Sequence, residues 1–303
     1  EEAYPIHGSS NVVARIELQG GDVARGFKDA ELIFEGRYAT PPVHHGAIEP
    51  HAVIASFDAM GKLTVFAPCQ NTFAFRILYA KIFGLPFSKV RVVSPAIGGA
   101  FGGKLEMTLE PVAVALAKAT GRPVKLEYDR RETVAATRVR HGSVTYLKTG
   151  VNRDGVIVAQ EMTVITNTGA YAGSALNVIG AMSHKVFKMY KFKNMRFVGI
   201  PVYTNTPVAG AMRGYGSPQA YFAQQCHMQK IADALGMPME DFQRKNLVEP
   251  HDLDQTGRFP IGNPRPRDCL ERALELARNW EPLSDEGGRY KIGVGLAMGA
   301  HGN

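Results

Sequence analysis

Cysteine is scarce in this sequence, and long apolar runs are absent. The cysteines stand far apart and form no Cys-x-x-Cys pair, so we predict neither a disulfide framework nor a zinc or iron–sulfur site at Cys69, Cys226 and Cys269. A reducing cytoplasm suits such a chain. No apolar run reaches the length of a membrane span, and the opening EEAYPIHGSS lacks the basic and apolar segments of a signal peptide. We therefore expect a soluble globular protein without a membrane partner.

Signatures of nucleic-acid-binding modules are also absent. The net charge is +7, and the densest basic run, HKVFKMYKFKNMRF, contains Lys185, Lys188, Lys191, Lys193 and Arg196. Aromatic and apolar residues interrupt this run, which is typical of a solvated edge whose apolar side chains face the core. We therefore predict no nucleic-acid partner, while the positive charge suits an anionic ligand.

The length of 303 residues and a hydrophobic content of 45% allow one large domain or two modest ones. Residue 1 is Glu rather than Met, so we expect a piece of a longer polypeptide or a product of processing. Strands dominate the expected lead-in over residues 12–38. Residues 62–129 predict strand, helix, strand, glycine loop, helix and strand in that order, which favours an α/β fold of mixed α+β layers.

The second half of the chain predicts two long strands and two helices. The strands cover residues 143–149 and 156–166 and turn through NRDG in a hairpin. One helix has Ser217 as its N-cap and Pro218 in its first position, and another covers residues 267–279.

The segment SPAIGGAFGGK lacks side chains at four of six positions and still keeps one aromatic residue. Its glycines, at 98, 99, 102 and 103, surround Phe101 and precede Lys104. Glycine weakens regular elements, so this cluster predicts a backbone that adopts unusual dihedral angles or lets a ligand approach closely. A purely structural turn is the alternative.

Residues 98–104 also match the GxxxxGK skeleton of a phosphate-binding P-loop. Leu105 stands where the Ser or Thr that holds magnesium belongs, and Pro111 would interrupt a helix that began at Lys104. The dinucleotide-binding pattern GxGxxG is absent. We therefore expect close backbone contact with a polar or anionic group, by a geometry different from that of a P-loop.

A second aromatic residue flanked by glycines occurs in AMRGYGSPQA. Arg213 stands beside these glycines and directly before a helix N-terminus, where free N–H groups favour anions. Tyr215 lies between Gly214 and Gly216, so its ring can project beyond the backbone. Alone, the segment predicts an ordinary capped helix with a surface arginine. Beside the first glycine segment, it favours a shared ligand.

Imidazole and carboxylate groups gather in HHGAIEPH, which contains His44, His45, Glu49 and His51. Such groups bind zinc or iron, but their spacing is not that of one helix face. A structural histidine is the commoner outcome at each position, and we favour that interpretation over a metal site.

The motifs CQNT, IGGAFGGK and MRGYGSPQA, together with EPH before a strand, resemble the molybdenum-cofactor-binding subunit of the xanthine dehydrogenase and aldehyde oxidase family. The resemblance covers about residues 12–250. It implies the family's α/β molybdopterin-binding domain over residues 18–250, after a lead-in, residues 1–17, from a missing upstream domain. Residues 251–303 would be a connector, a helix and the first strand of a second molybdopterin-binding domain that is incomplete in this chain.

The resemblance also implies a molybdenum cofactor, molybdopterin in its cytosine dinucleotide form, and assigns residues to it. Gln70 would place its amide close to the metal's apical oxygen, with Arg213 on the other side. The residues that would wrap the pterin dithiolene and the metal are Gly99, Ala100, Phe101 and Gly102. Phe101 would turn its backbone toward the metal ligands and shield the metal from bulk water. Gln70, Phe101 and Arg213 would thus lie near the molybdenum.

Substrate contacts follow from the same resemblance. Tyr215 would be the aromatic plate against which a flat substrate stacks. Purine hydroxylases of the family carry a Glu directly after the Lys of the first motif and an Arg upstream of the second, at positions that fall on Leu105 and Ala181. Because both polar anchors are missing from the substrate site, we predict that xanthine is a poor substrate.

The implied reaction is hydroxylation of an electron-poor carbon, with water as the oxygen source, on an aromatic N-heterocycle or an aldehyde. Electrons would leave through 2Fe-2S clusters to FAD on partner subunits. This chain offers no catalytic base, so the family's catalytic glutamate would come from a second half of the site. We expect Asn303 to mark a natural split between two polypeptides, as in nicotinate dehydrogenase. The alternative function is a phosphate- or nucleotide-binding module that uses residues 98–104 without redox chemistry.

Overall fold

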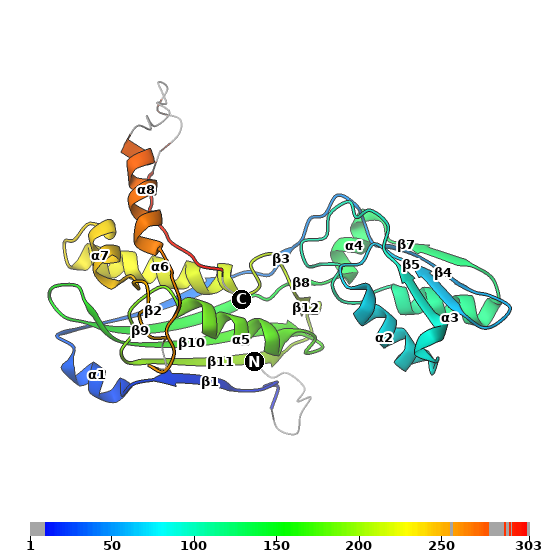
Figure 1. Ribbon diagram of the computed structural model, residues 1–303, viewed down its shortest axis with the longest axis horizontal. Coiled ribbons are helices and arrows are strands. Elements are labelled where there is room, and N and C mark those ends of the chain that lie inside the picture. The colour runs from blue at the N-terminus through cyan, green and yellow to red at the C-terminus, as the bar shows by residue number, and fades with distance from the viewer. Residues whose placement is uncertain (1–9, 255–256, 279–287, 289–290, 292, 302–303) are drawn as a thin grey trace.

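The described residues form two lobes joined by a small sheet (Figure 1). The computed structural model describes residues 10–254, 257–278, 288, 291 and 293–301. Each lobe has its own hydrophobic core. Residues 1–9 of the predicted lead-in lie outside the described residues, as do parts of the predicted second domain.

The larger lobe is built on a five-stranded sheet in the order β1-β11-β10-β9-β2. Its strands are β1 (Ile16–Gly20), β2 (Leu32–Thr40), β9 (Ser143–Val151), β10 (Ile157–Gly169) and β11 (Met195–Tyr203). Only the β10–β11 pair is parallel within this sheet. The predicted hairpin of two long strands is confirmed as β9 and β10, which turn through residues 152–155.

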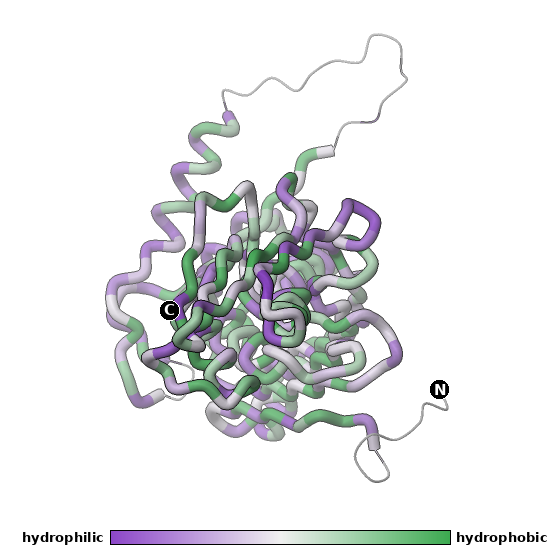
Figure 2. Tube along the Cα trace, turned by 90° about the vertical axis from the view of Figure 1, so that its right-hand side faces the viewer, coloured by the Kyte–Doolittle hydropathy of each residue, from purple (hydrophilic) through white to green (hydrophobic). Residues whose placement is uncertain are grey.

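Helices α1 (Val23–Asp29), α5 (Ala175–Val186) and α6 (Ser217–Ala234) pack against this sheet. Helix α7 (Met239–Asn246) packs on α6, and α8 (Pro266–Arg278) adds Leu270 to the larger core. Helix α5 packs on β10 and β11, while α6 packs on β2 and β9. Figure 2 shows α8 standing off the body with polar and apolar residues alternating along it. Among the described helices none is long and apolar enough to cross a membrane.

Two helix expectations need correction. The lead-in over residues 12–38 contains β1 and most of β2, but helix α1, which was not predicted, lies between them, because the Asp22 side chain accepts from the Arg25 N–H and caps a short helix. Helix α6 starts with Pro218 in its first turn, as predicted, but its N-cap is Gly216 and not Ser217. The left-handed φ of 87° at Gly216 turns the chain into the helix, so no side-chain cap forms.

The smaller lobe holds a four-stranded sheet in the order β6-β5-β4-β7. Its strands are β4 (Ala52–Phe57), β5 (Leu63–Phe66), β6 (Val90–Val93) and β7 (Val124–Glu127). Its helical segments are α2 (Thr72–Phe83), the 3-10 turn η1 (Phe87–Lys89), α3 (Glu110–Thr120) and α4 (Arg130–Ala136). The predicted order of strand, helix, strand, glycine loop, helix and strand is confirmed here.

A three-stranded sheet connects the lobes, in the order β12-β8-β3 (Figure 1). Its strands are only two residues long: β3 (Val43–His44), β8 (Val139–Arg140) and β12 (Ala209–Gly210). Strand β12 leads directly into the segment before α6, and the glycine-rich segment after β6 reaches the same region from the smaller lobe. The connecting sheet therefore brings the two predicted loops together.

The last described segment, residues 293–301, contains no strand. It packs on the larger core through Leu296, Met298 and Ala300, and the Met298 N–H donates to Oε1 of Gln225 at 3.0 Å. A strand pairs its backbone N–H groups with carbonyls of a neighbouring strand, whereas here the Met298 N–H is satisfied by the side-chain amide of Gln225 in α6. The assignment of residues 251–303 to a second domain stays a prediction.

Candidate functional site

The first glycine loop, residues 98–104, and the second glycine loop, residues 212–216, touch through their main chains. The Arg213 N–H donates to the Phe101 carbonyl at 2.9 Å. A Cβ on Gly102 would lie 2.5 Å from the Ala211 carbonyl oxygen, so only glycine allows this approach. The two aromatic, glycine-flanked segments therefore form one site.

Both aromatic residues of these loops have a left-handed backbone. Phe101 has a φ of 53° and Tyr215 a φ of 43°, and among the described residues other than glycine only His251 shares this property. Such a conformation costs a non-glycine residue about 1 kcal/mol, and strained residues of this kind cluster at functional sites. Phe101 is 46% exposed, whereas Tyr215 is half-buried against the larger core.

Gln70 holds the first glycine loop from the smaller lobe. Its side-chain Oε1 accepts from the N–H groups of Gly102 at 3.0 Å and Lys104 at 3.3 Å, and its backbone N–H donates to the Lys104 carbonyl at 2.9 Å. The next residue, Asn71, caps α2. The motif CQNT therefore fixes an exposed amide beside Phe101, and the Gln70 NH₂ group carries the remaining donors.

The histidine-rich segment hydrogen-bonds the backbone of the first loop and of Ala211, the residue before the second loop. Nε2 of His45 donates to the Ala211 carbonyl at 2.7 Å, and Nε2 of His51 donates to the Gly103 carbonyl at 3.1 Å. Burial lowers the pKa of both imidazoles. Within the described part of the chain, no three His, Cys, Asp or Glu side chains gather as a metal site. The hydrogen bonds of His45 and His51 agree with the structural interpretation of HHGAIEPH.

Lys104 does not act as the lysine of a P-loop. Its side chain is 1% exposed, and its ammonium group pairs with the carboxylate of Glu49, which also accepts from the Gly98 N–H at 3.0 Å. Helix α3 begins only at Glu110, with Pro111 in its first turn. The ammonium therefore points into the protein, and the phosphate-binding alternative loses the group that would carry it.

The second glycine loop is held by two cations that sequence patterns did not single out for this role. Nη2 of Arg140 donates to the Arg213 carbonyl at 2.7 Å. Nζ of Lys185 donates to the carbonyls of Gly214 and Tyr215, each at 3.3 Å. The interpretation of Lys185 as part of a solvated edge is wrong, because α5 carries this residue under the loop and leaves it 7% exposed.

The two substitutions expected at the substrate side lie on different elements. Leu105 closes the turn after the first loop, where its N–H donates to the Gly102 carbonyl at 3.2 Å, and Ala181 lies on α5. Both are half-buried, and neither carries a polar side-chain group. The nearest acid in sequence, Glu106, pairs with Arg138 at 3.4 Å.

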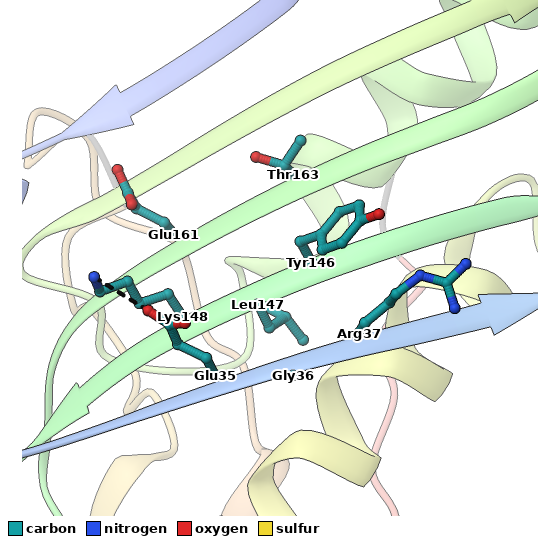
Figure 3. A pocket seen from close by; sticks show the side chains of 8 residues that line it. All are labelled: Glu35, Gly36, Arg37, Tyr146, Leu147, Lys148, Glu161 and Thr163. Atoms are coloured by element: carbon teal, nitrogen blue, oxygen red, sulfur yellow. Dashed lines mark ion pairs between the residues drawn. The ribbon is translucent and has the colours of Figure 1, made fainter. Parts of the chain in front are cut away.

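A hollow of about 490 Å³ lies away from the loops, on β2, β9 and β10 (Figure 3). Figure 3 shows Glu35, Arg37, Lys148 and Glu161 around it, and Glu35 pairs with Lys148 at 3.2 Å. Neighbours in sequence such as Tyr38 belong to the core, so these side chains occupy the other face of the sheet. This hollow contains no residue of either glycine loop and is separate from the site.

The two lobes form a mixed α/β frame in which the two glycine loops touch. The chain matches the family model of the molybdopterin cofactor-binding domain over residues 6–247, and it therefore belongs to that family. This finding confirms the fold and the resemblance predicted from the motifs.

The chain is 35% identical over 251 residues to a probable xanthine dehydrogenase subunit of Bacillus subtilis (strain 168), a match that covers 83% of this chain and 34% of that protein. It is 34% identical to the nicotinate dehydrogenase large molybdopterin subunit of Eubacterium barkeri, over 91% of this chain and 65% of that one. The structure of aldehyde oxidoreductase from Desulfovibrio gigas matches with a TM-score of 0.86 and 28% identity, over 92% of this chain and 31% of that one. The chain thus spans only part of each of these proteins.

Proposed function

We propose that this chain supplies one half of the active site of a molybdenum hydroxylase that acts on an aromatic N-heterocycle or an aldehyde. The supporting observation is the 2.9 Å hydrogen bond from the Arg213 N–H to the Phe101 carbonyl, which joins the two motifs that resemble the family. Similar proteins are named as a xanthine dehydrogenase subunit, a nicotinate dehydrogenase subunit and an aldehyde oxidoreductase. The complete enzyme would also need parts that this chain does not supply.

The groups around the loops fit an anionic pterin cofactor. Gly99 and Gly102 both have a φ of 102°, which lets the backbone lie close to a bulky ligand. The NH₂ group of Gln70, the exposed guanidinium of Arg213 and the start of α6 supply donors and positive charge. When bound, the molybdenum cofactor, in its cytosine dinucleotide form, supplies the two-electron redox chemistry that places a water-derived oxygen on the substrate carbon.

The chain's own residues would position the reactants. Gln70 and Arg213 would hold the molybdenum group, and residues 99–102 would contact the pterin through their main chain. Phe101, which is 46% exposed, would shield the metal from water. Tyr215 would offer a ring face to a flat substrate. Preorganised donors of this kind stabilise developing charge without reorganising during the reaction.

Partners complete the proposed enzyme. A second molybdopterin-domain half would carry the catalytic glutamate, an iron–sulfur subunit the 2Fe-2S clusters, and a flavin subunit the FAD. We place the assembly in the cytoplasm, because Cys69, Cys226 and Cys269 are free thiols. Peptide mapping of the native assembly decides whether the second half is a separate polypeptide.

Metal and nucleotide analysis of the natively purified assembly tests the proposal. We expect about one molybdenum atom per assembly and release of a cytosine nucleotide on acid treatment. An assembly without molybdenum that ATP stabilises against thermal unfolding would instead support the nucleotide-binding module and overturn the proposal.

Substrate choice tests the finer assignment. Leu105 and Ala181 offer no hydrogen-bonding side chain to a purine. We therefore expect kcat/KM for xanthine to be about 100-fold or more below that for a pyridine carboxylate or an aldehyde. Equal values would show that purine anchors come from residues outside this pair.

A further inference from the structure

Three consecutive carbonyls of the second glycine loop accept hydrogen bonds from cationic side chains. The carbonyl of Arg213 accepts from Arg140, and the carbonyls of Gly214 and Tyr215 accept from Lys185. The two cations reach the loop from different elements, β8 and α5. Hydrogen bonds from charged donors are about twice as strong as those between neutral groups when they are short. The Arg140 bond, at 2.7 Å, is of this kind, and the two Lys185 bonds, at 3.3 Å, are longer and add charge at two further carbonyls.

The loop needs such support because its backbone is strained. Gly214, Tyr215 and Gly216 have φ values of 92°, 43° and 87°, three left-handed residues in succession. Tyr215 lacks the conformational freedom of glycine, so it keeps its left-handed conformation only because neighbouring groups hold it there. Lys185 meets this need at Tyr215 itself, since Nζ bonds the Tyr215 carbonyl and lies 5.9 Å from the centre of its ring.

Arg140 acts on the contact between the two loops. Arg213 is held at both ends, since its N–H donates to the Phe101 carbonyl at 2.9 Å and its carbonyl accepts from Arg140 at 2.7 Å. Nη1 of Arg140 also donates to Oε1 of Gln219 at 3.3 Å, and Gln219 is buried in α6. One guanidinium therefore ties the loop to the helix that follows it.

Both cations lack a carboxylate partner among the described residues, in contrast to Lys104 with Glu49. Nζ of Lys185 has Nδ1 of His301 as its third neighbour, at 3.2 Å. Burial lowers the pKa of Lys185, with a further contribution from the charge of Lys188. Among the described residues, the partners of these two cations at the loop are therefore carbonyl dipoles rather than carboxylates.

We propose that Arg140 and Lys185 are positioning residues that lock the second glycine loop in the strained geometry that holds Arg213 and Tyr215 against Phe101. Only the catalytic consequence of this inference rests on the proposed function. The loop geometry itself can be measured whatever the ligand is.

Hydrogen exchange of the full chain in its native assembly measures the loop directly. The reporters are the amides of Arg213, which bonds Phe101, and Tyr215, which bonds Met212. In Arg140→Gln and Lys185→Met we expect both amides to exchange about tenfold faster or more, because the carbonyls on either side lose their donors. Lys185→Arg keeps a cation of similar reach, and we expect it to restore most of the protection.

Matched controls separate a local effect from general loss of stability. Lys193→Met removes an exposed lysine of the same basic run, and Arg131→Gln removes an exposed arginine of α4. Neither should change exchange in the loop. If Arg140→Gln fails to fold, Arg140→Lys keeps the charge but cannot bond the loop and Gln219 at once, so a smaller increase is expected. Unchanged exchange in both loop variants would overturn the proposal, as would equal acceleration throughout the chain.

Kinetics and metal content of the same assemblies separate positioning from folding and from the proposed function. We expect Lys185→Met to retain molybdenum and lower kcat by about tenfold, with rescue by Lys185→Arg. An equal loss of kcat in Lys185→Arg and Lys185→Met would contradict the positioning role. Wild-type assemblies without molybdenum but with the expected exchange pattern would overturn the proposed function and leave this inference standing.

Discussion

The two glycine loops share a left-handed aromatic residue but differ in the side chains that support them. Each presents an aromatic residue at positive φ between glycines, Phe101 in the first loop and Tyr215 in the second. The first loop is held by the neutral amide of Gln70, the imidazole of His51 and the ion pair of Lys104 with Glu49. The second is held by two cations of the larger lobe that have carbonyls as partners.

This difference indicates which of the two loops an anionic ligand would stabilise more. The charges of Lys104 and Glu49 compensate each other, so this pair offers little net attraction to a nearby anion. The charges of Arg140 and Lys185 remain available to attract one, because carbonyl dipoles balance them only in part. An anionic ligand should therefore stabilise the second loop more than the first.

Acid should weaken the lobe of the second loop most, and this is the largest effect we expect. Burial lowers the pKa of His141 and His227 to about 4. An unfolded histidine titrates near pH 6.5. Below that pH the unfolded state binds more protons than the folded state, so each histidine removes about 3 kcal/mol of stability between pH 7 and pH 4. Urea unfolding across this range measures the loss.

Two variants assign the acid effect to its source. His227→Gln should flatten the pH dependence, because it removes an imidazole that Tyr38 and Thr149 enclose. His184→Gln removes an exposed histidine of α5 and should leave the dependence unchanged. Equal pH dependence in both variants would show that acid acts elsewhere in the chain.

Removal of the ion pair should break the support of the first loop. Lys104→Met leaves the Glu49 carboxylate without its cation, and breaking a buried pair in this way costs about 3 kcal/mol. We take the lower end of the usual range because Glu49 is 31% exposed. Denaturant unfolding measures the change, with Lys118→Met on the exposed side of α3 as the control. A loss equal to that of the control would mean that the pair does not stabilise the loop.

Separation of the loops should have a somewhat smaller effect. Gly102→Ala places a Cβ 2.5 Å from the Ala211 carbonyl oxygen and must push the loops apart, at a cost of about 2 kcal/mol. Gly84→Ala is the matched control, because its φ is also positive at 63° but no atom lies within 4 Å of the new Cβ. It should cost about 1 kcal/mol through backbone strain alone. Thermal unfolding compares the two, and equal losses would argue against a tight contact between the loops.

Arg213→Ala, in the second loop, should change the stability least and still lower molybdenum content or turnover. The side chain of Arg213 is exposed, so Arg213→Ala should change the free energy of unfolding by less than about 0.5 kcal/mol. Molybdenum content or turnover of the assembly should nevertheless fall about tenfold, because a cation beside the proposed cofactor is lost. Full occupancy with normal turnover would reject the role of Arg213, and Arg131→Ala serves as the control.

Local patterns in the sequence were enough to predict most elements but not their side-chain partners. The helical spacing of Phe73, Ile77, Leu78 and Ile82, ending at Gly84, predicts helix α2, and the helix forms. The predicted buried face is wrong, because these four side chains are exposed and the helix buries Phe75 and Tyr79 instead. Helix α1 escaped prediction because its seven residues are too few for a periodic pattern. Arg140 bonds a carbonyl 73 residues away, and His45 bonds one 166 residues away. No local spacing encodes such contacts, and the assignment of individual residues to the cofactor stays a prediction.

The contact between Phe101 and Arg213 has a kinetic consequence for the newly made chain. The two residues belong to different lobes and are more than a hundred positions apart. Bringing distant segments together costs chain entropy, which makes such contacts slow to form. We therefore expect both lobes to acquire their cores before the loops meet, so that each new molecule passes through a folded state that is not yet competent to take up its ligand.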